Sequence, residues 1–188
     1  NPGFGGVVPE TRAVARNDQL AEGNFNDATY EGFRLRVRWA PNADWDLQLQ
    51  HTSQTIETDG VWDFDPTLGD LNSVSFQPDT AEDEFDLTTW TVTGRLASLE
   101  VIYTGSYLDR LVEGISDYSG YADVGPYIPY YICDYPGYAN CGAPAFYLDQ
   151  YYNTERTTQE FRLNTDMDRR LRLLVGVFYD DTENIERG

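Results

Sequence analysis

The sequence predicts an all-β protein, an antiparallel up-and-down transmembrane β-barrel segment of about six strands. Three observations support this prediction. Runs of alternating apolar and polar residues recur along the chain, short turns join these runs in pairs, and long polar loops separate the pairs. Short periplasmic turns at one end and long extracellular loops at the other are typical of transmembrane barrels.

The first predicted strand, residues 31–39, has two clearly different faces. Its apolar side chains are Phe33, Leu35, Val37 and Trp39, and its charged side chains are Arg34, Arg36 and Arg38. Because successive side chains of a strand point to opposite faces, this alternation places the two sets on separate surfaces. A tight turn at residues 41–44 leads into a partner strand, residues 45–55, with the same alternation.

Two further hairpins follow the same scheme. Residues 85–96 turn at Ala97-Ser98 into residues 99–109, and residues 154–164 turn through 165–170 into residues 171–182. The last strand is apolar on both faces, whereas the others keep a polar face. We expect the arginines on the polar faces to point into a barrel lumen; they are Arg34, Arg36, Arg38, Arg95 and Arg162.

The strands divide the chain into alternating hairpins and loops. We predict hairpins at residues 31–55, 85–109 and 154–182. We predict extracellular loops at residues 1–30, 56–84 (acidic) and 110–153 (tyrosine-rich), and the start of another at 183–188. Six strands are too few to close a membrane barrel, so we expect a piece of a larger one. A soluble β-sandwich also alternates, but its strands are usually only about five or six residues long.

Composition excludes several classes of function. The formal net charge of −19 argues against nucleic acid as a partner, because binding phosphates requires a basic surface. The aromatic content of 14% is too high for a disordered acidic chain. The sequence contains no nucleophile motif, P-loop or Rossmann fingerprint, and no spacing singles out a catalytic pair of carboxylates. We therefore expect a protein that is not an enzyme.

The long loops hold the candidate ligand-binding residues. Tyrosine and tryptophan combine a rigid apolar face with a polar group, which suits recognition of rings or sugars. The candidates are Trp62, Tyr127, Tyr130, Tyr131, Tyr135 and Tyr138. Alternatively, these aromatic side chains only pack the loops against one another and against the barrel rim.

Two cysteines and a group of aspartates lie in the same loops. Cys133 and Cys141 are close in sequence within a loop rich in tyrosine, proline and glycine, which predicts a local disulfide in an oxidising compartment. The aspartates of the first long loop are Asp59, Asp63, Asp65 and Asp70. Their oxygens suit Ca²⁺, but the spacing lacks the glycine and closing glutamate of an EF-hand loop. We expect a solvated acidic loop and no metal or other cofactor.

Three hairpins resemble those of a known family. Residues 157–164, Thr-Thr-Gln-Glu-Phe-Arg-Leu-Asn, followed by Leu-Arg-Leu-Leu-Val-Gly-Val-Phe-Tyr at 171–179, resemble a strand pair of TonB-dependent outer-membrane receptors. Residues 33–50 and 90–110 resemble further hairpins of such barrels. The resemblance implies a bacterial outer-membrane barrel of about 22 strands, plugged by a separate domain, that imports a scarce nutrient with energy from TonB.

The resemblance also implies a set of partners. These are outer-membrane lipid and lipopolysaccharide, the rest of the parent barrel and its plug domain, TonB through the parent protein, and a small siderophore-like, vitamin or carbohydrate ligand. Nothing in these residues resembles the plug domain or the TonB-contacting segment of the family, and we expect both to belong to the parent protein. The residues leave two alternatives open, a secreted β-sandwich carbohydrate-binding module and an outer-membrane barrel that does not transport.

Overall fold

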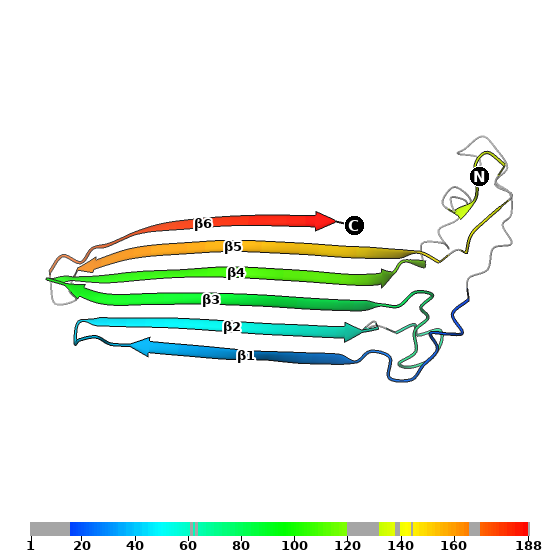
Figure 1. Ribbon diagram of the computed structural model, residues 1–188, viewed down its shortest axis with the longest axis horizontal. Helices are drawn as coiled ribbons and strands as arrows, with labels where there is room; N and C mark the ends of the chain where they lie inside the picture. Colours follow the sequence, from blue (N-terminus) through cyan, green and yellow to red (C-terminus); the bar gives the residue numbers. More distant parts are fainter. Residues whose placement is uncertain are drawn as a thin grey trace.

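The computed structural model describes residues 16–60, 62, 64–119, 132–137, 140–143, 145–165 and 170–187. The strands are β1 (Ala28–Trp39), β2 (Trp45–Asp59), β3 (Thr80–Leu96), β4 (Leu99–Asp117), β5 (Tyr147–Thr165) and β6 (Leu174–Arg187). They form one antiparallel sheet in chain order, with β1 and β6 as its two edges (Figure 1). The predicted all-β, up-and-down arrangement is confirmed, and the sheet is open. The described residues contain no helix long and apolar enough to cross a membrane.

The first two short turns lie where the sequence predicts them, and the third includes residues 166–169, which lie outside the described residues. All six strands extend further toward the long loops than predicted, with β1 beginning at Ala28. β2 continues to Asp59, β3 begins at Thr80, β4 continues to Asp117 and β5 begins at Tyr147. β6 begins at Leu174, three residues later than predicted, and runs on to Arg187. The predicted loops 1–30, 56–84 and 110–153 are therefore too long, and most of the segment predicted to start a loop at 183–188 belongs to β6. Backbone pairing continues into segments whose acidic side chains show no apolar alternation, because the ladder needs only backbone groups.

Local side-chain and backbone features fix the turns. The Asn42 side-chain oxygen accepts hydrogen bonds from the backbone N–H groups of Asp44, at 2.9 Å, and Trp45, at 3.1 Å. Asparagine often stabilises a turn in this way, by accepting hydrogen bonds from backbone N–H groups two or three residues later. The β3–β4 turn has two residues, and Ala97 takes a φ of 56° there. A left-handed φ is costly for alanine, so this turn carries backbone strain.

The pairing register places most apolar side chains of the short-turn halves of the strands on one face, which we call the apolar face. The opposite face also carries apolar side chains, among them Phe85, Leu87, Ile102, Leu108, Leu174 and Phe178. At the short-turn end of the apolar face, its apolar side chains form a continuous apolar band. Its members are Phe33, Leu35, Val37, Trp39, Trp45, Leu47, Leu49, Trp90, Val92, Leu99, Val101, Tyr103, Tyr107, Phe161, Leu163, Val175, Val177 and Tyr179.

Toward the long loops the same face becomes acidic. Carboxylates outnumber the apolar side chains there, although Leu111, Ile115 and Ile185 share the region, and we call it the acidic band. Its carboxylates are Glu31, Glu57, Asp59, Glu82, Glu84, Asp86, Asp109, Glu113, Asp117, Asp149, Glu155, Asp181 and Glu183. The apolar face therefore changes from apolar to acidic along the strands, and the change falls at nearly the same register position on neighbouring strands.

The opposite, polar face carries threonines, serines, glutamines and cross-strand ion pairs. Arg110 binds Asp83 through two hydrogen bonds of 2.8 and 2.5 Å, which link β4 to β3. Arg156 binds Asp180 and so links β5 to β6. Arg38 donates to Asp46 at 2.5 Å across the first hairpin. These pairs are exposed, so each contributes about 1 kcal/mol or less.

The sheet has no hydrophobic core of its own. Among the described residues no large side chain is fully buried. Large apolar side chains are instead exposed, with Leu35 at 61%, Trp39 at 62% and Val177 at 68%. A single sheet leaves both of its faces uncovered, and we expect most of its stability to come from whatever packs against the apolar band.

Candidate functional site

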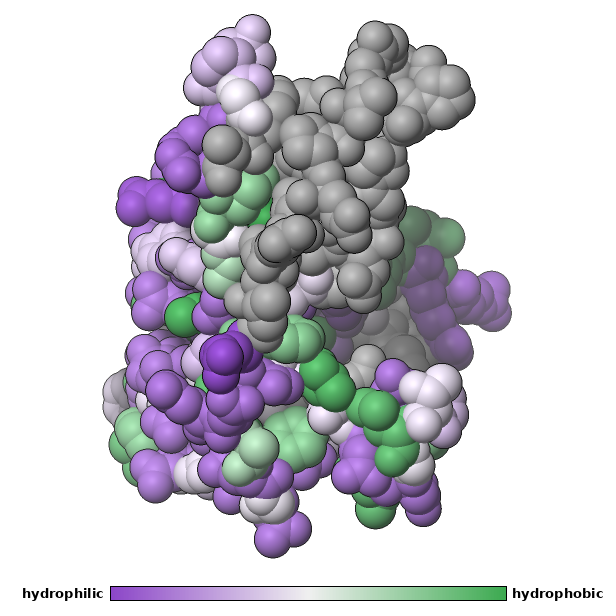
Figure 2. Space-filling view, turned by 90° about the vertical axis from the view of Figure 1, so that its right-hand side faces the viewer, coloured by the Kyte–Doolittle hydropathy of each residue, from purple (hydrophilic) through white to green (hydrophobic). Residues whose placement is uncertain are grey.

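A cleft of about 380 Å³ opens at the long-loop end of the sheet, between the segment that precedes β1 and the first long loop. Six of its fourteen lining residues are apolar: Leu20, Ala21, Phe25, Trp62, Phe64 and Leu71. Amides and hydroxyls contribute as many residues: Asn17, Asn24, Asn26, Asn72, Ser73 and Ser75. Figure 2 views this end of the molecule and shows small hydrophobic areas set among hydrophilic ones. The cleft volume lies within the range of roughly 300–1,000 Å³ typical of small-molecule sites.

One wall of the cleft is anchored to the end of β2. The Asp59 N–H donates to the Asp27 carbonyl at 2.9 Å, and the Gly60 N–H donates to the Asp79 carbonyl at 2.7 Å. Gly60 has a φ of +71°, and a Cβ at this position would lie 2.5 Å from Cδ2 of Phe25. Glycine is therefore required twice here, for its backbone conformation and for the close approach of the Phe25 ring.

The opposite wall is a compact turn within the first long loop. The Asp65 N–H donates to the Asn72 carbonyl at 2.7 Å, and the Leu68 N–H donates to the Asp65 carbonyl at 3.0 Å. Oδ1 of Asp65 accepts bonds from Oγ1 of Thr67, at 2.6 Å, and from the Thr67 N–H, at 2.8 Å. These bonds to Thr67, its hydroxyl first, lower the pKa of the Asp65 carboxyl. The turn places Phe64 and Leu71 on the cleft.

Two aspartates join the first long loop to the base of the second. Oδ1 of Asp79 accepts a bond from the Asp117 N–H at 2.7 Å, and Oδ2 of Asp117 accepts one from the Phe76 N–H at 2.6 Å. The Ser119 hydroxyl oxygen accepts a hydrogen bond from the Phe146 N–H at 3.0 Å, and Ser119 is only 5% exposed. These hydrogen bonds, made by partly buried side chains and by the buried Ser119, hold the backbone at the base of both loops in place.

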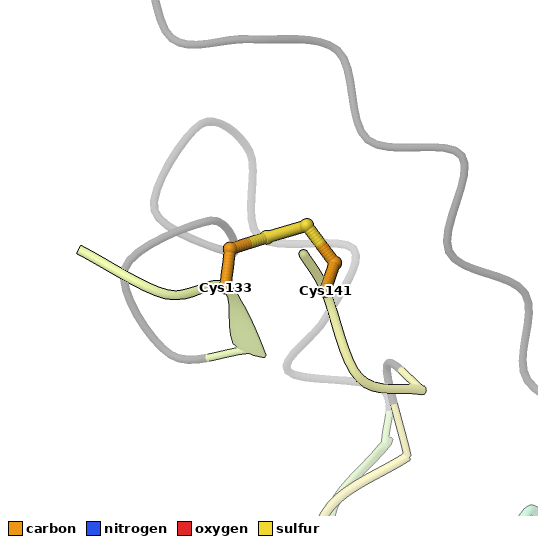
Figure 3. Close-up of a disulfide and its surroundings, with 2 residues drawn as sticks. All are labelled: Cys133 and Cys141. Carbon is orange, nitrogen blue, oxygen red and sulfur yellow. A yellow bond between two sulfur atoms is a disulfide. The ribbon is translucent and has the colours of Figure 1, made fainter. Parts of the chain in front are cut away.

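The structure brings one predicted ligand-binding residue, Trp62, into the cleft, where its side chain is 71% exposed. Tyr135 is 84% exposed but lies in the second loop and does not line the cleft. The remaining candidates, Tyr127, Tyr130, Tyr131 and Tyr138, lie outside the described residues. The predicted disulfide is present: Cys133 and Cys141 are bonded and also form a β-bridge (Figure 3).

The aspartates considered for Ca²⁺ do not form a ligand set in the part of the chain that the structure describes. Oδ1 of Asp65 already accepts hydrogen bonds from Thr67, and Asp63 lies outside the described residues. Across the described ranges, no group of three or more carboxylate, histidine or cysteine side chains is arranged to hold a metal ion.

The arginines predicted to face a lumen share the polar face of the sheet. The register aligns Arg34, Arg36 and Arg38 of β1 with Arg95 of β3 and Arg162 of β5 on that side. Arg162 pairs with Glu160 at 2.6 Å, and Arg36 binds Gln48. None of these arginines lines the loop-end cleft.

Sequence reasoning missed most of the cleft. Phe25 and the asparagines before β1 were not candidates, because nothing local shows that this segment folds back on a loop about forty residues later. The Asp59-Gly60 dipeptide was an available signal, since such pairs mark turns. Comparisons with protein-family models, with curated proteins and with solved structures give no match. The candidate site is therefore defined by its own geometry.

Proposed function

We propose that this chain forms part of the barrel wall of a bacterial outer-membrane receptor of the TonB-dependent type, which imports a scarce nutrient. The observation that carries the proposal is the uncovered apolar band, which runs across all six strands at the short-turn end. Soluble monomers rarely expose apolar patches larger than a few hundred Å², and larger ones mark protein or membrane contacts. Aromatic and aliphatic side chains on one face and polar ones on the other are typical of a barrel wall.

The size of the apolar band suits a bilayer. On β4 it runs from Leu99 to Tyr107, roughly 26 Å along the strand at about 3.3 Å per residue. Strands of such barrels tilt by about 40°, which reduces the height to roughly 20 Å. That height is slightly less than the apolar belt of about 25 Å in outer-membrane barrels. Trp39 and Trp45 lie at the short-turn edge of the band, where an aromatic girdle would meet the membrane surface.

The other face and the two edges support the same proposal. Threonines, serines, glutamines and paired arginines on the polar face suit a wet lumen or a plug domain. β1 and β6 each have one unpaired edge. In a bilayer such edges must be paired, so we propose that further strands complete the barrel on both sides. The described loops and the disulfide would then lie outside the cell, in an oxidising compartment.

The soluble alternative has less support. A β-sandwich buries the apolar faces of two sheets against each other, and the described residues form a single sheet. A barrel that does not transport would share every feature of the sheet. Transport is favoured by the resemblance of the hairpins to TonB-dependent receptors and by a loop-end cleft of ligand size.

Fractionation of cells that express the whole protein tests the proposal. We expect the protein to sediment with outer membranes, to resist extraction by alkaline carbonate and to be released by detergent. Recovery in the soluble fraction would overturn it. Dependence on TonB is tested separately, by comparing uptake of labelled ligand in strains with and without TonB. Equal uptake in the two strains would show that the barrel does not use TonB for transport.

A further inference from the structure

We infer that the loop-end cleft binds a neutral carbohydrate. The inference rests on the proposed function in one respect only: it takes the carbohydrate bound in the cleft to be the nutrient that the receptor imports. Three features of the cleft carry it: exposed flat aromatic groups, side-chain amides with no partner in the described structure, and a nearly uncharged lining.

The aromatic groups are available for stacking. Trp62 is 71% exposed and Phe64 is 49% exposed, and both line the cleft. The faces of pyranose rings present C–H groups that pack on flat aromatic rings, while their edges present hydroxyls. A site for such a ligand therefore needs apolar and polar groups side by side rather than an apolar pocket. The cleft has this mixture, with six residues of each kind.

The amide and hydroxyl side chains of the lining suit the hydroxyl groups of a sugar. A side-chain amide offers donors and an acceptor together, so it can both donate to one hydroxyl and accept from its neighbour. The side chains of Asn17, Asn24 and Asn26 make no hydrogen bond to any other described residue and remain available for this role. Asn72, in contrast, already donates to the Asp70 carbonyl at 2.9 Å.

Charge argues against the other ligand classes. Glu22 is the single charged side chain among the described residues that line the cleft, and no arginine accompanies it. Anionic chelates or phosphates would find no cationic partner there, in a chain with a formal net charge of −19. A multivalent cation would find a single carboxylate among neutral amides and hydroxyls, too little negative charge to compensate for its lost hydration. A flat, wholly apolar ligand would leave the asparagine amides unpaired on binding.

The cleft is also preformed. The anchors at Asp59, Gly60 and Asp65 hold both walls through backbone groups, so a ligand need not order them. Binding to a preformed site loses less conformational entropy, which allows weakly interacting ligands such as neutral sugars to be held.

An array of neutral and acidic glycans, probed with the whole protein in detergent and followed by titration calorimetry, tests the inference. We expect at least one neutral oligosaccharide to bind. Trp62→Ala should weaken this binding at least tenfold, whereas Trp62→Phe should keep it within a few fold because a flat ring remains. Tyr147→Ala is the matched control, since Tyr147 is an aromatic residue that is 60% exposed and lies outside the cleft, and it should leave affinity within twofold.

Three results would overturn the inference: binding confined to sialylated or sulfated glycans, no glycan binding at all, or neutral-glycan binding that Trp62→Ala does not change. Ferric citrate and cyanocobalamin, titrated in parallel, stand for the chelate and vitamin classes; binding of either with dependence on Trp62 would also overturn it. These outcomes are independent of membrane fractionation. A protein that sediments with outer membranes but binds no glycan leaves the proposed function standing.

Discussion

The indole ring of Trp90 lies over Gly105, its register partner on β4. A Cβ at position 105 would lie 2.5 Å from Cε2 and 2.7 Å from Nε1 of Trp90, closer than real atoms pack. Gly105 is buried because the ring covers it, and Trp45 covers Gly94 of β3 in the same way. Each aromatic ring fills the space that a strand glycine leaves empty, which stabilises a sheet otherwise weakened there.

Gly105→Ala should therefore destabilise the sheet by about 1–3 kcal/mol, the usual range for overpacking. The measurement is denaturant unfolding of the protein reconstituted in lipid vesicles, followed by tryptophan fluorescence. Gly23→Ala is the control, because a Cβ at that position meets nothing within 4 Å. Equal stability of the two variants would show that the contact between Trp90 and Gly105 has no energetic role.

Ala97→Gly should stabilise the β3–β4 hairpin. Ala97 has a φ of 56°, a region that costs an L-residue roughly 1–2 kcal/mol and glycine almost nothing. The greater freedom of glycine in the unfolded chain offsets about 0.4–1 kcal/mol of this gain. We expect a net stabilisation of about 0.5–1 kcal/mol by the same unfolding measurement. A loss of stability would mean that the turn is unstrained in the folded protein.

The three hairpins were predictable because local signals define them. Asn42 caps the first turn with its own side chain, and the apolar alternation of residues 33–39 fixes which face is which. The loop ends of the strands were not predictable. Thr80 to Glu84 belong to β3 because they pair with β2 and β4. A short acidic segment has no apolar alternation, so its sequence does not show that it pairs with distant strands.

The candidate site was predictable only in part for the same reason. Trp62 stood out as an aromatic residue in an acidic loop, but Phe25 completes the cleft through a contact with Gly60 that depends on the whole first hairpin. The disulfide was predictable because its two cysteines are close in sequence and no other cysteine competes.

Gly60→Ala should disrupt the cleft. The substitution forces an L-residue to a φ of +71° and drives its Cβ into the Phe25 ring, so the segment before β1 must move. We expect acrylamide quenching of a variant with Trp62 as its sole tryptophan to change, and carbohydrate affinity to fall at least fivefold. Gly137→Ala is the control, because a Cβ there meets nothing within 4 Å. Unchanged quenching and affinity would contradict the assigned role of Gly60.

The Asp65 turn should weaken in acid. Hydrogen bonds from Thr67 lower the pKa of the Asp65 carboxyl in the folded loop. This contribution to loop stability is complete above the ordinary aspartate pKa of about 3.9 and is lost as pH falls through the folded value. Thr67→Val removes the hydroxyl bond, so the Asp65 pKa should rise toward its ordinary value in a carboxyl-carbon NMR titration. Thr67→Ser keeps the bond and should leave the pKa low; identical titrations of the two variants would contradict this explanation.

Depth-dependent quenching by brominated lipids addresses whether the apolar band faces a bilayer. The chain has four tryptophans, of which Trp39, Trp45 and Trp90 lie on the apolar face and Trp62 lies in the loop-end cleft. Variants that keep one tryptophan each would be reconstituted into vesicles of lipids brominated at shallow or deep acyl positions. We predict that deep bromines quench Trp90, that shallow bromines quench Trp39 and Trp45, and that Trp62 is quenched only by aqueous acrylamide. Quenching of all four by acrylamide, with no effect of brominated lipid, would contradict a membrane-facing sheet.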